Sequence, residues 1–232
     1  MNRILKISGI FVISTLYVSQ VTAITVSDKA NKLAQENIII DSHIDVPYRL
    51  EEKWVDVTNA PFMSIYIPAS LDSSANSTKL ADKLIDYVEA IVGRAPDKFA
   101  IASSTADVEQ QFAKGLISLP LGMENGSPIQ GDLANLKHFY ERGIRYITLA
   151  HSMANHISDS SYDLRRKWQG LSPFGKELVK EMNNLGILVD ISHVSDAAFY
   201  QAIDISQTPV IASHSSLRAF TPGFERNMDD EM

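Results

Sequence analysis

The 232-residue chain contains no cysteine, and this absence excludes several kinds of chemistry. Disulfide bonds, thiolate zinc sites, a cysteine nucleophile and a lipidated N-terminal cysteine all require that residue. Any metal must therefore bind to His, Asp or Glu side chains. Basic residues are fewer than acidic ones, 21 against 28, which gives a formal net charge of −7. That charge disfavours a partner with a phosphate backbone, so we expect no nucleic-acid partner.

The sequence also lacks internal repeats, low-complexity tracts and a glycine-rich phosphate loop. No glycine-flanked elbow surrounds Ser215 or Ser216, so a serine nucleophile is disfavoured there. Hydrophobic residues make up 45% of the chain and charged residues 21%, which is unlike a disordered or fibrous protein. The length is sufficient for a sizeable hydrophobic core.

The N-terminus has the pattern of a secretory signal peptide. Arg3 and Lys6 provide a positive start, residues 7–18 are mostly apolar, and residues 21–23 form a small-residue cleavage site. The apolar stretch is short for a bilayer span of about 20 residues. We therefore expect removal of residues 1–23, export to the periplasm or outside the cell, and no stable membrane span. An uncleaved anchor is the alternative.

Residues 24–232 alternate between short apolar runs and amphipathic stretches. This alternation predicts an α/β fold with parallel strands and right-handed crossovers. Strands are expected at residues 38–41, 62–67, 116–122, 144–149, 187–191 and 210–213, with a short extra strand at 99–102. Helices are expected at residues 27–37, 77–92, 105–113, 132–142, 173–185 and 195–204.

Titratable groups follow the carboxyl ends of five of these strands. A (β/α) barrel builds its active site in this way, whereas an open doubly wound sheet gathers its site at one switch point. The sequence therefore predicts a TIM-like (β/α)8 barrel. The groups concerned are Asp41, His43, Asp45, Glu124, His151, His193 and His214.

The pattern around His43 and Asp45 indicates a metal site. The two residues are separated by one position, so in an extended segment both side chains point to the same side. Imidazole and carboxylate together suit zinc foremost, with manganese or iron as alternatives. A hydrogen-bonded pair at a strand end is the simpler interpretation of this motif alone.

Three more strand-end residues strengthen the metal hypothesis. His193 and His214 could each be structural, and Glu124 could be a salt-bridge partner. If they are buried together, the free-energy cost must be offset, because a buried unpaired polar group costs roughly 1–3 kcal/mol. A bound metal ion would offset it. The carboxylate of Glu124 could bridge two cations. His151 could donate a hydrogen bond to a developing oxyanion, or it could cap its strand.

Other polar and aromatic residues are weaker candidates. His138 lies in the middle of a predicted helix and suits packing or the surface, and His156 follows Asn155 in a loop. Trp54 and Trp168 suit aromatic packing better than a pocket wall.

Five segments of the chain resemble the membrane dipeptidase (renal dipeptidase) family of zinc peptidases. They are IIIDSHIDVPYRL, LGMENGSPI, GIRYITLAHS, GLSPFGKELVKEMNNLGILVDISHVSD and PVIASHSS. The resemblance extends from about residue 37 to residue 232. It implies a metal-dependent-hydrolase barrel with two zinc ions and a dipeptide substrate; a homodimer is possible.

The resemblance also implies a role for individual residues. His43 and Asp45 would bind one zinc, His193 and His214 the other, and Glu124 would bridge them. A metal-bridging hydroxide would attack the peptide carbonyl, with Glu124 and His151 as the catalytic residues. His151 would contact the scissile carbonyl, and Arg226 would pair with the substrate's terminal carboxylate, which a guanidinium binds as a fork.

Two departures from the family support a second hypothesis. The connection at residues 55–60 is short for a parallel crossover. The chain also stops before two further strand–helix units, so about six of eight strands are expected, without the family's last catalytic aspartate. A non-catalytic metal-binding fragment is therefore the alternative function. A cyclic amidase or deaminase of the same barrel superfamily is disfavoured, because Glu124 stands in place of a carbamylated lysine.

Overall fold

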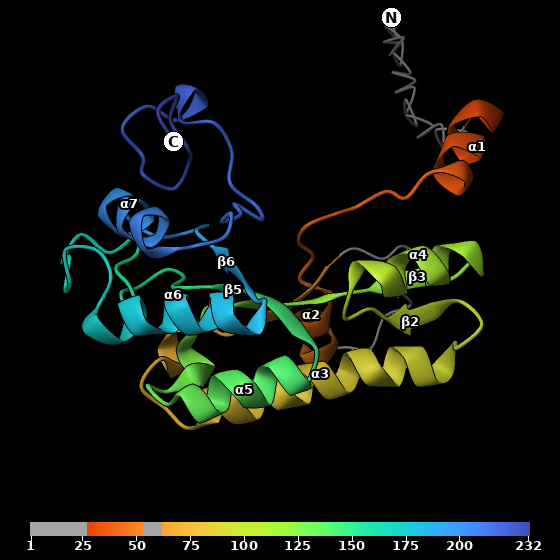
Figure 1. Cartoon of the computed structure of the whole chain (residues 1–232), viewed down its shortest axis with the longest axis horizontal. Helices are drawn as coiled ribbons and strands as arrows, with labels where there is room; N and C mark the ends of the chain where they lie inside the picture. Colours follow the sequence, from red (N-terminus) through yellow and green to blue (C-terminus); the bar gives the residue numbers. More distant parts are fainter. Residues whose placement is uncertain (1–26, 53–61) are drawn as a thin grey trace, which may run out of the picture. The chain divides into compact units, whose positions relative to one another are not determined.

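The computed structural model describes residues 27–52 and 62–232, and Figure 1 shows its ribbon. The chain divides into two compact units, residues 1–39 and residues 40–232. Three features discussed above lie outside the described residues: the signal peptide at residues 1–23, Trp54, and the short connection at residues 55–60.

The first unit contains helix α1 (Asp28–Glu36), which confirms the helix expected there. Ser27 caps it, since its Oγ accepts a hydrogen bond of 3.2 Å from the backbone N of Ala30. The strand expected at residues 38–41 is wrong: no strand forms, and Ile39 is 69% exposed. An apolar run becomes a strand only where a neighbouring strand pairs with it, and here backbone pairing starts only at residue 41.

The second unit is built around a four-stranded parallel sheet. In space the strand order is β1-β4-β5-β6, which is also their order in the chain. This is the winding of a (β/α) barrel, whereas the order reverses in a doubly wound sheet. The expected α/β fold with parallel strands is confirmed, and the sheet does not close within the described residues. The strands are β1 (Met63–Tyr66), β4 (Leu121–Glu124), β5 (Ile144–Thr148) and β6 (Leu188–Asp190).

A single parallel bridge extends each edge of this sheet. Ile44 bridges to β1, and Ile211 bridges to Asp190 of β6. The strand expected at residues 210–213 is therefore reduced to one bridge. The physical reason is that the backbone N of Ser213 donates to the Asp190 carboxylate at 3.0 Å, not to a backbone carbonyl of β6. Four strands and the Ile211 bridge occupy five of the six expected positions, and the Ile44 bridge lies three residues beyond the first one, at residues 38–41.

Pro120 divides the strand expected at residues 116–122 into two. The first part, β3 (Ile117–Leu119), pairs with β2 (Phe99–Ile101) in a separate two-stranded parallel sheet, and β4 begins after the proline. Proline has no N–H to donate to a ladder and thus marks strand boundaries. The short strand expected at residues 99–102 is confirmed as β2.

The remaining expected helices form within two residues of their expected ends, and α2 is an addition. Helix α6 illustrates why its ends could be predicted from the sequence. Ser172 caps its N-terminus, Pro173 occupies the first turn, and Gly186 ends the helix with φ +78°. The helices are α2 (Val46–Glu52), α3 (Asn76–Arg94), α4 (Thr105–Ala113), α5 (Leu133–Glu141), α6 (Pro173–Leu185) and α7 (Asp196–Ile205), with 3₁₀ turns η1 (Ala69–Leu71), η2 (Ser127–Ile129) and η3 (Arg218–Phe220).

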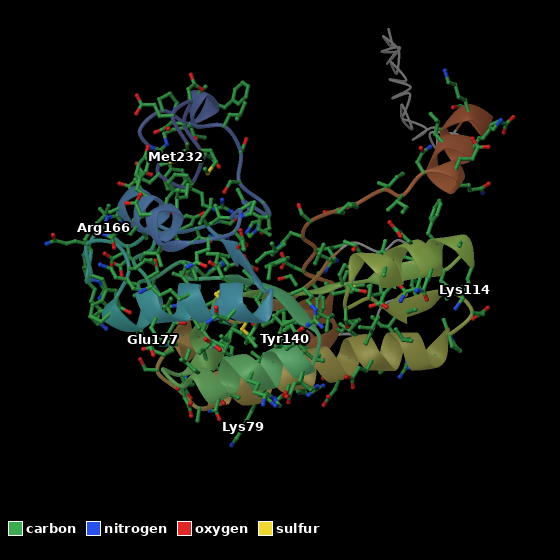
Figure 2. The ribbon with its side chains drawn as sticks, in the orientation of Figure 1. Lys79, Lys114, Tyr140, Arg166, Glu177 and Met232 are labelled. Carbon is green, nitrogen blue, oxygen red and sulfur yellow. The ribbon has the colours of Figure 1, made fainter. Side chains whose placement is uncertain are left out.

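Helices and strands share one hydrophobic core. Met63, Ile65, Leu121 and Met123 of β1 and β4 are completely buried. Helices α3 and α5 run side by side in Figure 1, and an ion pair of 2.8 Å between Asp82 and Arg142 joins α3 to the end of α5. The labelled lysines at the ends of α3 and α4 point outward in Figure 2. Within the described ranges, no helix combines the length and apolar character needed to cross a membrane.

Candidate metal centre

The polar residues that follow the strands meet at one edge of the sheet. Glu124 is the last residue of β4, and His43 immediately precedes the Ile44 bridge. His151 and His193 lie in the loops after β5 and β6, and His214 follows the Ile211 bridge. Parallel strands bring their carboxyl ends together, so side chains that are up to 171 residues apart in the sequence converge.

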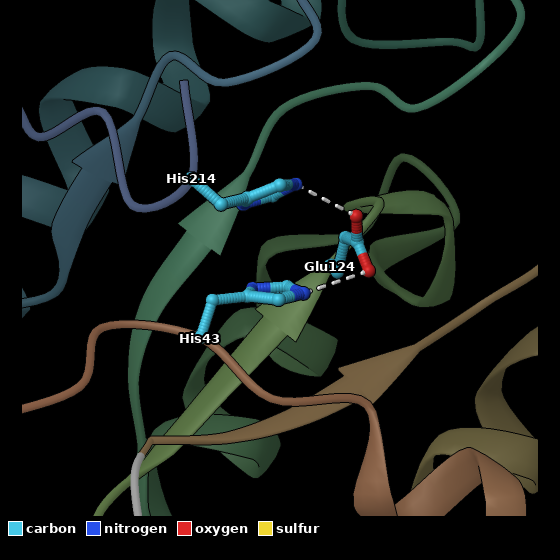
Figure 3. Close-up of side chains that lie close together, drawn as sticks. All are labelled: His43, Glu124 and His214. Atoms are coloured by element: carbon cyan, nitrogen blue, oxygen red, sulfur yellow. Dashed lines mark ion pairs between the residues drawn. The ribbon is translucent and has the colours of Figure 1, made fainter. Parts of the chain in front are cut away.

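The four imidazole rings surround the carboxylate of Glu124. Its Oε1 lies 3.0 Å from Nε2 of His193, 3.1 Å from Nε2 of His214 and 3.5 Å from Nε2 of His151. Its Oε2 lies 3.3 Å from Nε2 of His43. Figure 3 shows the His43 and His214 rings reaching the two oxygens from the same side, with ring centroids 3.9 Å apart.

Burial and hydrogen bonding act in opposite directions on Glu124. The residue is only 4% exposed, and burial by itself would raise the pKa of its carboxyl. Hydrogen bonds from His193, His214 and His43 outweigh that effect and hold the pKa of Glu124 well below its ordinary value. The site therefore presents a charged carboxylate to the imidazoles.

The histidines differ in protonation. Burial lowers the pKa of His193 to about 4, and it also lowers the pKa of His151. For His43, burial is outweighed by hydrogen bonds to Asp45 and Glu124, which raise the pKa to about 9. At neutral pH, His193 and His151 are therefore neutral imidazoles with a free lone pair.

The donors suit a divalent cation. Two groups of three residues each have ligand atoms within 4.8 Å of one another: His43 with Glu124 and His214, and Glu124 with His151 and His193. Imidazole nitrogens and carboxylate oxygens are ligands for zinc and related borderline metals. A cation would also compensate the crowding of His193 and His214, whose Nε2 atoms are 2.7 Å apart. The residues therefore fit a metal centre.

Asp45 and Arg226 lie at the margin of this centre. Asp45 Oδ1 is 3.2 Å from Nε2 of His43, but its side chain is 56% exposed and lies outside both groups of three. Arg226 donates to the backbone carbonyl of His214 at 3.0 Å, and its Nη2 lies 3.2 Å from Nε2 of His193. A guanidinium group thus borders the candidate metal ligands.

Two of the histidines are held through their backbone. Ser161 donates to the carbonyl of His193 from its N at 2.7 Å and from its Oγ at 2.9 Å. The Ser160 hydroxyl donates to the carbonyl of His151. His193 adopts φ +69°, a left-handed conformation that costs energy for a residue with a Cβ. Strain of this kind persists only where neighbouring contacts hold it.

Sequence reasoning overlooked three residues behind the ligands. Tyr146 places its hydroxyl 3.0 Å from Nδ1 of His43, and Ser213 places its Oγ 2.8 Å from Nδ1 of His214. Asp190, completely buried in β6, accepts from Ser213. One signal was available, because a carboxylate within the buried run 187–191 must have hydrogen-bond partners.

The weaker candidates lie apart from the donors. His138 forms a half-exposed pair with Asp82 at 2.8 Å. His156 packs on Phe174, with ring centroids 5.6 Å apart, and burial lowers its pKa to about 4. Trp168 donates from Nε1 to the carbonyl of Asn155 at 2.8 Å. None of these three is in either group of donors.

Comparisons with known proteins place the chain in a family. Residues 27–232 match the sequence profile of the family described as Membrane dipeptidase (Peptidase family M19). An uncharacterized dipeptidase of Schizosaccharomyces pombe is 31% identical over 227 residues, covering 84% of this chain and 55% of the relative. Dipeptidase 3 of Mus musculus is 30% identical over 230 residues, covering 88% of this chain and 46% of the relative.

The fold has solved counterparts. A metallo peptidase from Rhodobacter sphaeroides has a TM-score of 0.74 and 22% sequence identity, covering 83% of this chain and 69% of that one. At this identity the likeness is one of fold. The chain spans about half the length of the curated relatives described above.

Proposed function

The chain belongs to the membrane dipeptidase family, peptidase family M19, and from this premise we propose that the protein is a metal-dependent dipeptidase. The observation that carries the proposal is the Glu124 carboxylate, buried and within 3.5 Å of the Nε2 atoms of His43, His151, His193 and His214. Such a set of donors is costly to bury without a cation to bind.

We assign the ligands to two zinc ions, to both of which Glu124 would contribute. His43 and Asp45 would hold one ion, and His193 and His214 would hold the other. This division is supported by the contact of Asp45 with His43 and by the close approach of His193 to His214. When bound, such cations polarise a carbonyl and make a water molecule acidic enough to lose a proton near neutral pH.

His151 acts on the substrate and not on the metal in this proposal. Burial keeps it neutral, so one ring nitrogen carries a hydrogen that it can donate to the oxygen of the scissile carbonyl. Tyr66 packs edge-on against the ring at 4.9 Å and limits its rotation. The deprotonated carboxylate of Glu124 lies next to it, 3.5 Å from its Nε2, and can accept a hydrogen bond at the reacting centre.

Arg226 selects substrates with a free C-terminus. Its guanidinium borders the metal ligands, and a guanidinium binds a carboxylate through two parallel hydrogen bonds. Ser215 Oγ accepts from Nη1 at 2.9 Å and orients the group. In a dipeptide whose carboxylate is bound there, only the C-terminal residue lies between that carboxylate and the single peptide bond.

The experiment is a hydrolysis assay of the 232-residue chain with unblocked dipeptides, before and after removal of metal by a chelator and after restoration with zinc. Activity that disappears with the metal and returns with zinc supports the proposal. Unchanged hydrolysis by fully metal-free protein would refute it. N-acetylated and C-amidated dipeptides serve as controls, and only the amide should lose its binding to Arg226.

A non-catalytic metal-binding fragment is the second candidate, because the chain spans about half of its curated relatives. A chain that folds and binds zinc but hydrolyses no dipeptide would favour it. We also propose that the protein is exported after cleavage behind residue 23, and N-terminal sequencing of the mature protein tests this. We propose a homodimer as well, and sedimentation of the purified chain measures its oligomeric state.

A further inference from the structure

A buried chain of hydrogen bonds ends on one of the proposed ligands. Asp190 Oδ2 accepts from Ser213 Oγ at 2.6 Å, and the same Oγ lies 2.8 Å from Nδ1 of His214. Asp190 is completely buried and Ser213 is 7% exposed. Neither residue is in the ligand sets assigned above.

The donors around Asp190 determine the direction of these hydrogen bonds. Oδ1 accepts from the backbone N of Ser192 at 3.1 Å and from that of Ser213 at 3.0 Å, and a backbone N can only donate. Oδ2 accepts from Thr148 Oγ1 at 2.5 Å and from Ser213 Oγ. Four donors match the four lone pairs of a carboxylate, so Asp190 acts as an acceptor throughout.

The direction of these hydrogen bonds also determines which nitrogen of His214 carries a hydrogen. The Ser213 hydroxyl has one hydrogen, and Asp190 takes it. Toward His214 the hydroxyl oxygen can therefore only accept, so Nδ1 of His214 must carry the hydrogen. The nitrogen left to bind a metal is then Nε2, whose contact of 3.1 Å with Glu124 a metal ion would replace.

We infer that Asp190 and Ser213 are positioning residues that hold the proton of His214 on Nδ1 and so prepare Nε2 to bind the metal. This inference rests on the proposed function, since it concerns the same centre. Outer partners of metal-binding histidines commonly set the tautomer and ring orientation, and their loss weakens metal binding roughly 10- to 100-fold.

Asp190→Asn is the sharpest test because it nearly keeps the shape and reverses the hydrogen bonding. The two backbone donors require the amide oxygen at the Oδ1 position, which leaves the amide NH₂ facing Thr148 and Ser213. The Ser213 hydroxyl then accepts from the amide and donates its hydrogen to Nδ1 of His214. The imidazole proton is thereby moved to Nε2, where it blocks metal binding.

Two measurements on the full chain follow. Nitrogen-15 NMR of labelled histidine, in metal-free protein at about pH 8, is expected to show a protonated Nδ1 for His214 in the wild type and an unprotonated Nδ1 in Asp190→Asn. The His214 signals are assigned by their absence from His214→Gln. Zinc affinity, measured by chelator competition, is expected to fall roughly 10- to 100-fold in Asp190→Asn.

Ser213→Ala is the second variant, and it should weaken zinc binding less than Asp190→Asn, because it releases the imidazole without holding the wrong tautomer. Ser158→Ala is the matched control: Ser158 is another buried serine, but its Oγ donates to the carbonyl of Asp159 at 2.9 Å. Its zinc affinity should equal that of the wild type.

The outcomes separate this inference from the proposed function. Wild-type protein without zinc affinity would contradict the proposed function. Tight zinc binding by the wild type, with unchanged affinity and an unchanged Nδ1 signal in Asp190→Asn, would overturn the inference alone. If Asp190→Asn does not fold, unchanged zinc affinity in folded Ser213→Ala overturns it equally.

Discussion

The two sides of Glu124 hold their histidines by different means. On one side, the rings of His43 and His214 are fixed through Nδ1 by the hydroxyls of Tyr146 and Ser213. On the other side, the Nδ1 atoms of His151 and His193 are buried and have no hydrogen-bond partner among the described residues. Their backbone carbonyls are held instead, by Ser160 and Ser161.

This difference separates two requirements of a metal enzyme. A ring fixed through its outer nitrogen has a defined direction before the metal arrives, which favours binding. A ring whose outer nitrogen has no partner is oriented only by the contacts of its inner side, such as that of His193 Nε2 with Glu124. We therefore associate the ring-held side, His43 and His214, with metal affinity, and the backbone-held side, His151 and His193, with adjustment to substrate and metal.

Glu124→Gln should have the largest effect because both sides depend on this residue. The amide has no charge and cannot bridge two cations. We expect zinc affinity to fall at least about 100-fold and dipeptide hydrolysis to disappear. Chelator competition and the hydrolysis assay measure this, and a variant that still binds two zinc ions as tightly would contradict the assignment.

Gly122→Ala should weaken only the ring-held side, through the contact of Tyr146 with His43. A Cβ at this position would lie 2.0 Å from Cζ of Tyr146, whose ring packs over the glycine in the sheet interior. The tyrosine must move, and overpacking of this kind costs about 1–3 kcal/mol of unfolding free energy. Zinc affinity should fall with it, since Tyr146 no longer reaches Nδ1 of His43.

Gly93→Ala is the matched control for that variant. Gly93 lies in helix α3, and a Cβ there meets no atom within 4 Å. Alanine at a helical site should stabilise the protein by about 0.5–1 kcal/mol and leave zinc binding unchanged. Urea unfolding measures both variants, and equal stability of the two would argue against the packing of Tyr146 on Gly122.

Ser161→Ala should affect the backbone-held side more weakly. It removes one of the two hydrogen bonds to the His193 carbonyl and keeps the bond from the Ser161 backbone N. We expect a loss of about 1 kcal/mol in unfolding free energy and a change in zinc affinity smaller than tenfold. A loss as large as that of Gly122→Ala would remove the distinction between the two sides.

Asp72 makes the stability of the fold sensitive to pH near the loop that follows His151. Its Oδ1 accepts from Asn125 at 2.7 Å, and Asn125 in turn accepts from Asn155, in the loop that follows His151. Burial raises the pKa of Asp72 to about 6, against the hydrogen bond from Asn125, which lowers it. A carboxyl whose pKa is higher in the folded state stabilises the fold while protonated, so its contribution is lost as pH rises from about 4 to about 6.

Asp72→Asn should remove this loss, because an asparagine has no charge and its oxygen can still accept from Asn125. The variant should become more stable relative to the wild type as pH rises through that range, by an amount on the order of 1 kcal/mol, since Asp72 is only partly buried. Urea unfolding at pH 4, 5, 6 and 7 measures the difference. A difference independent of pH would contradict the raised pKa.

The sequence was sufficient for the fold class and for the approach of the candidate ligands to one another. Continuous apolar runs separated by amphipathic helices predict parallel strands, and parallel strands bring the residues after them to one edge. Glu124 and His193 could therefore be named together although 69 positions separate them. Pro120 could also have been used, since a proline within an expected strand indicates a boundary.

Hydrogen-bond partners could not be derived in the same way. Tyrosine is a common residue type in strands, and nothing in the sequence around Tyr146 indicates that its hydroxyl reaches His43, 103 residues earlier. Ser213 was assigned to a strand, yet its backbone N is bound by the side chain of Asp190. Such contacts depend on distances of a few tenths of an ångström between segments that are remote in the chain.

Local chemistry, carried by residue type and spacing, thus determined where most strands and helices form, which residue types could bind a metal and which chemistries a chain without cysteine cannot perform. The tertiary structure alone decided which histidine rings have a partner on Nδ1, which have none, and where the ladder at residues 210–213 stops. The physical reason is that periodicity and strand direction act over short segments of sequence. The direction of a hydrogen bond, by contrast, depends on every donor and acceptor that the fold brings around one atom.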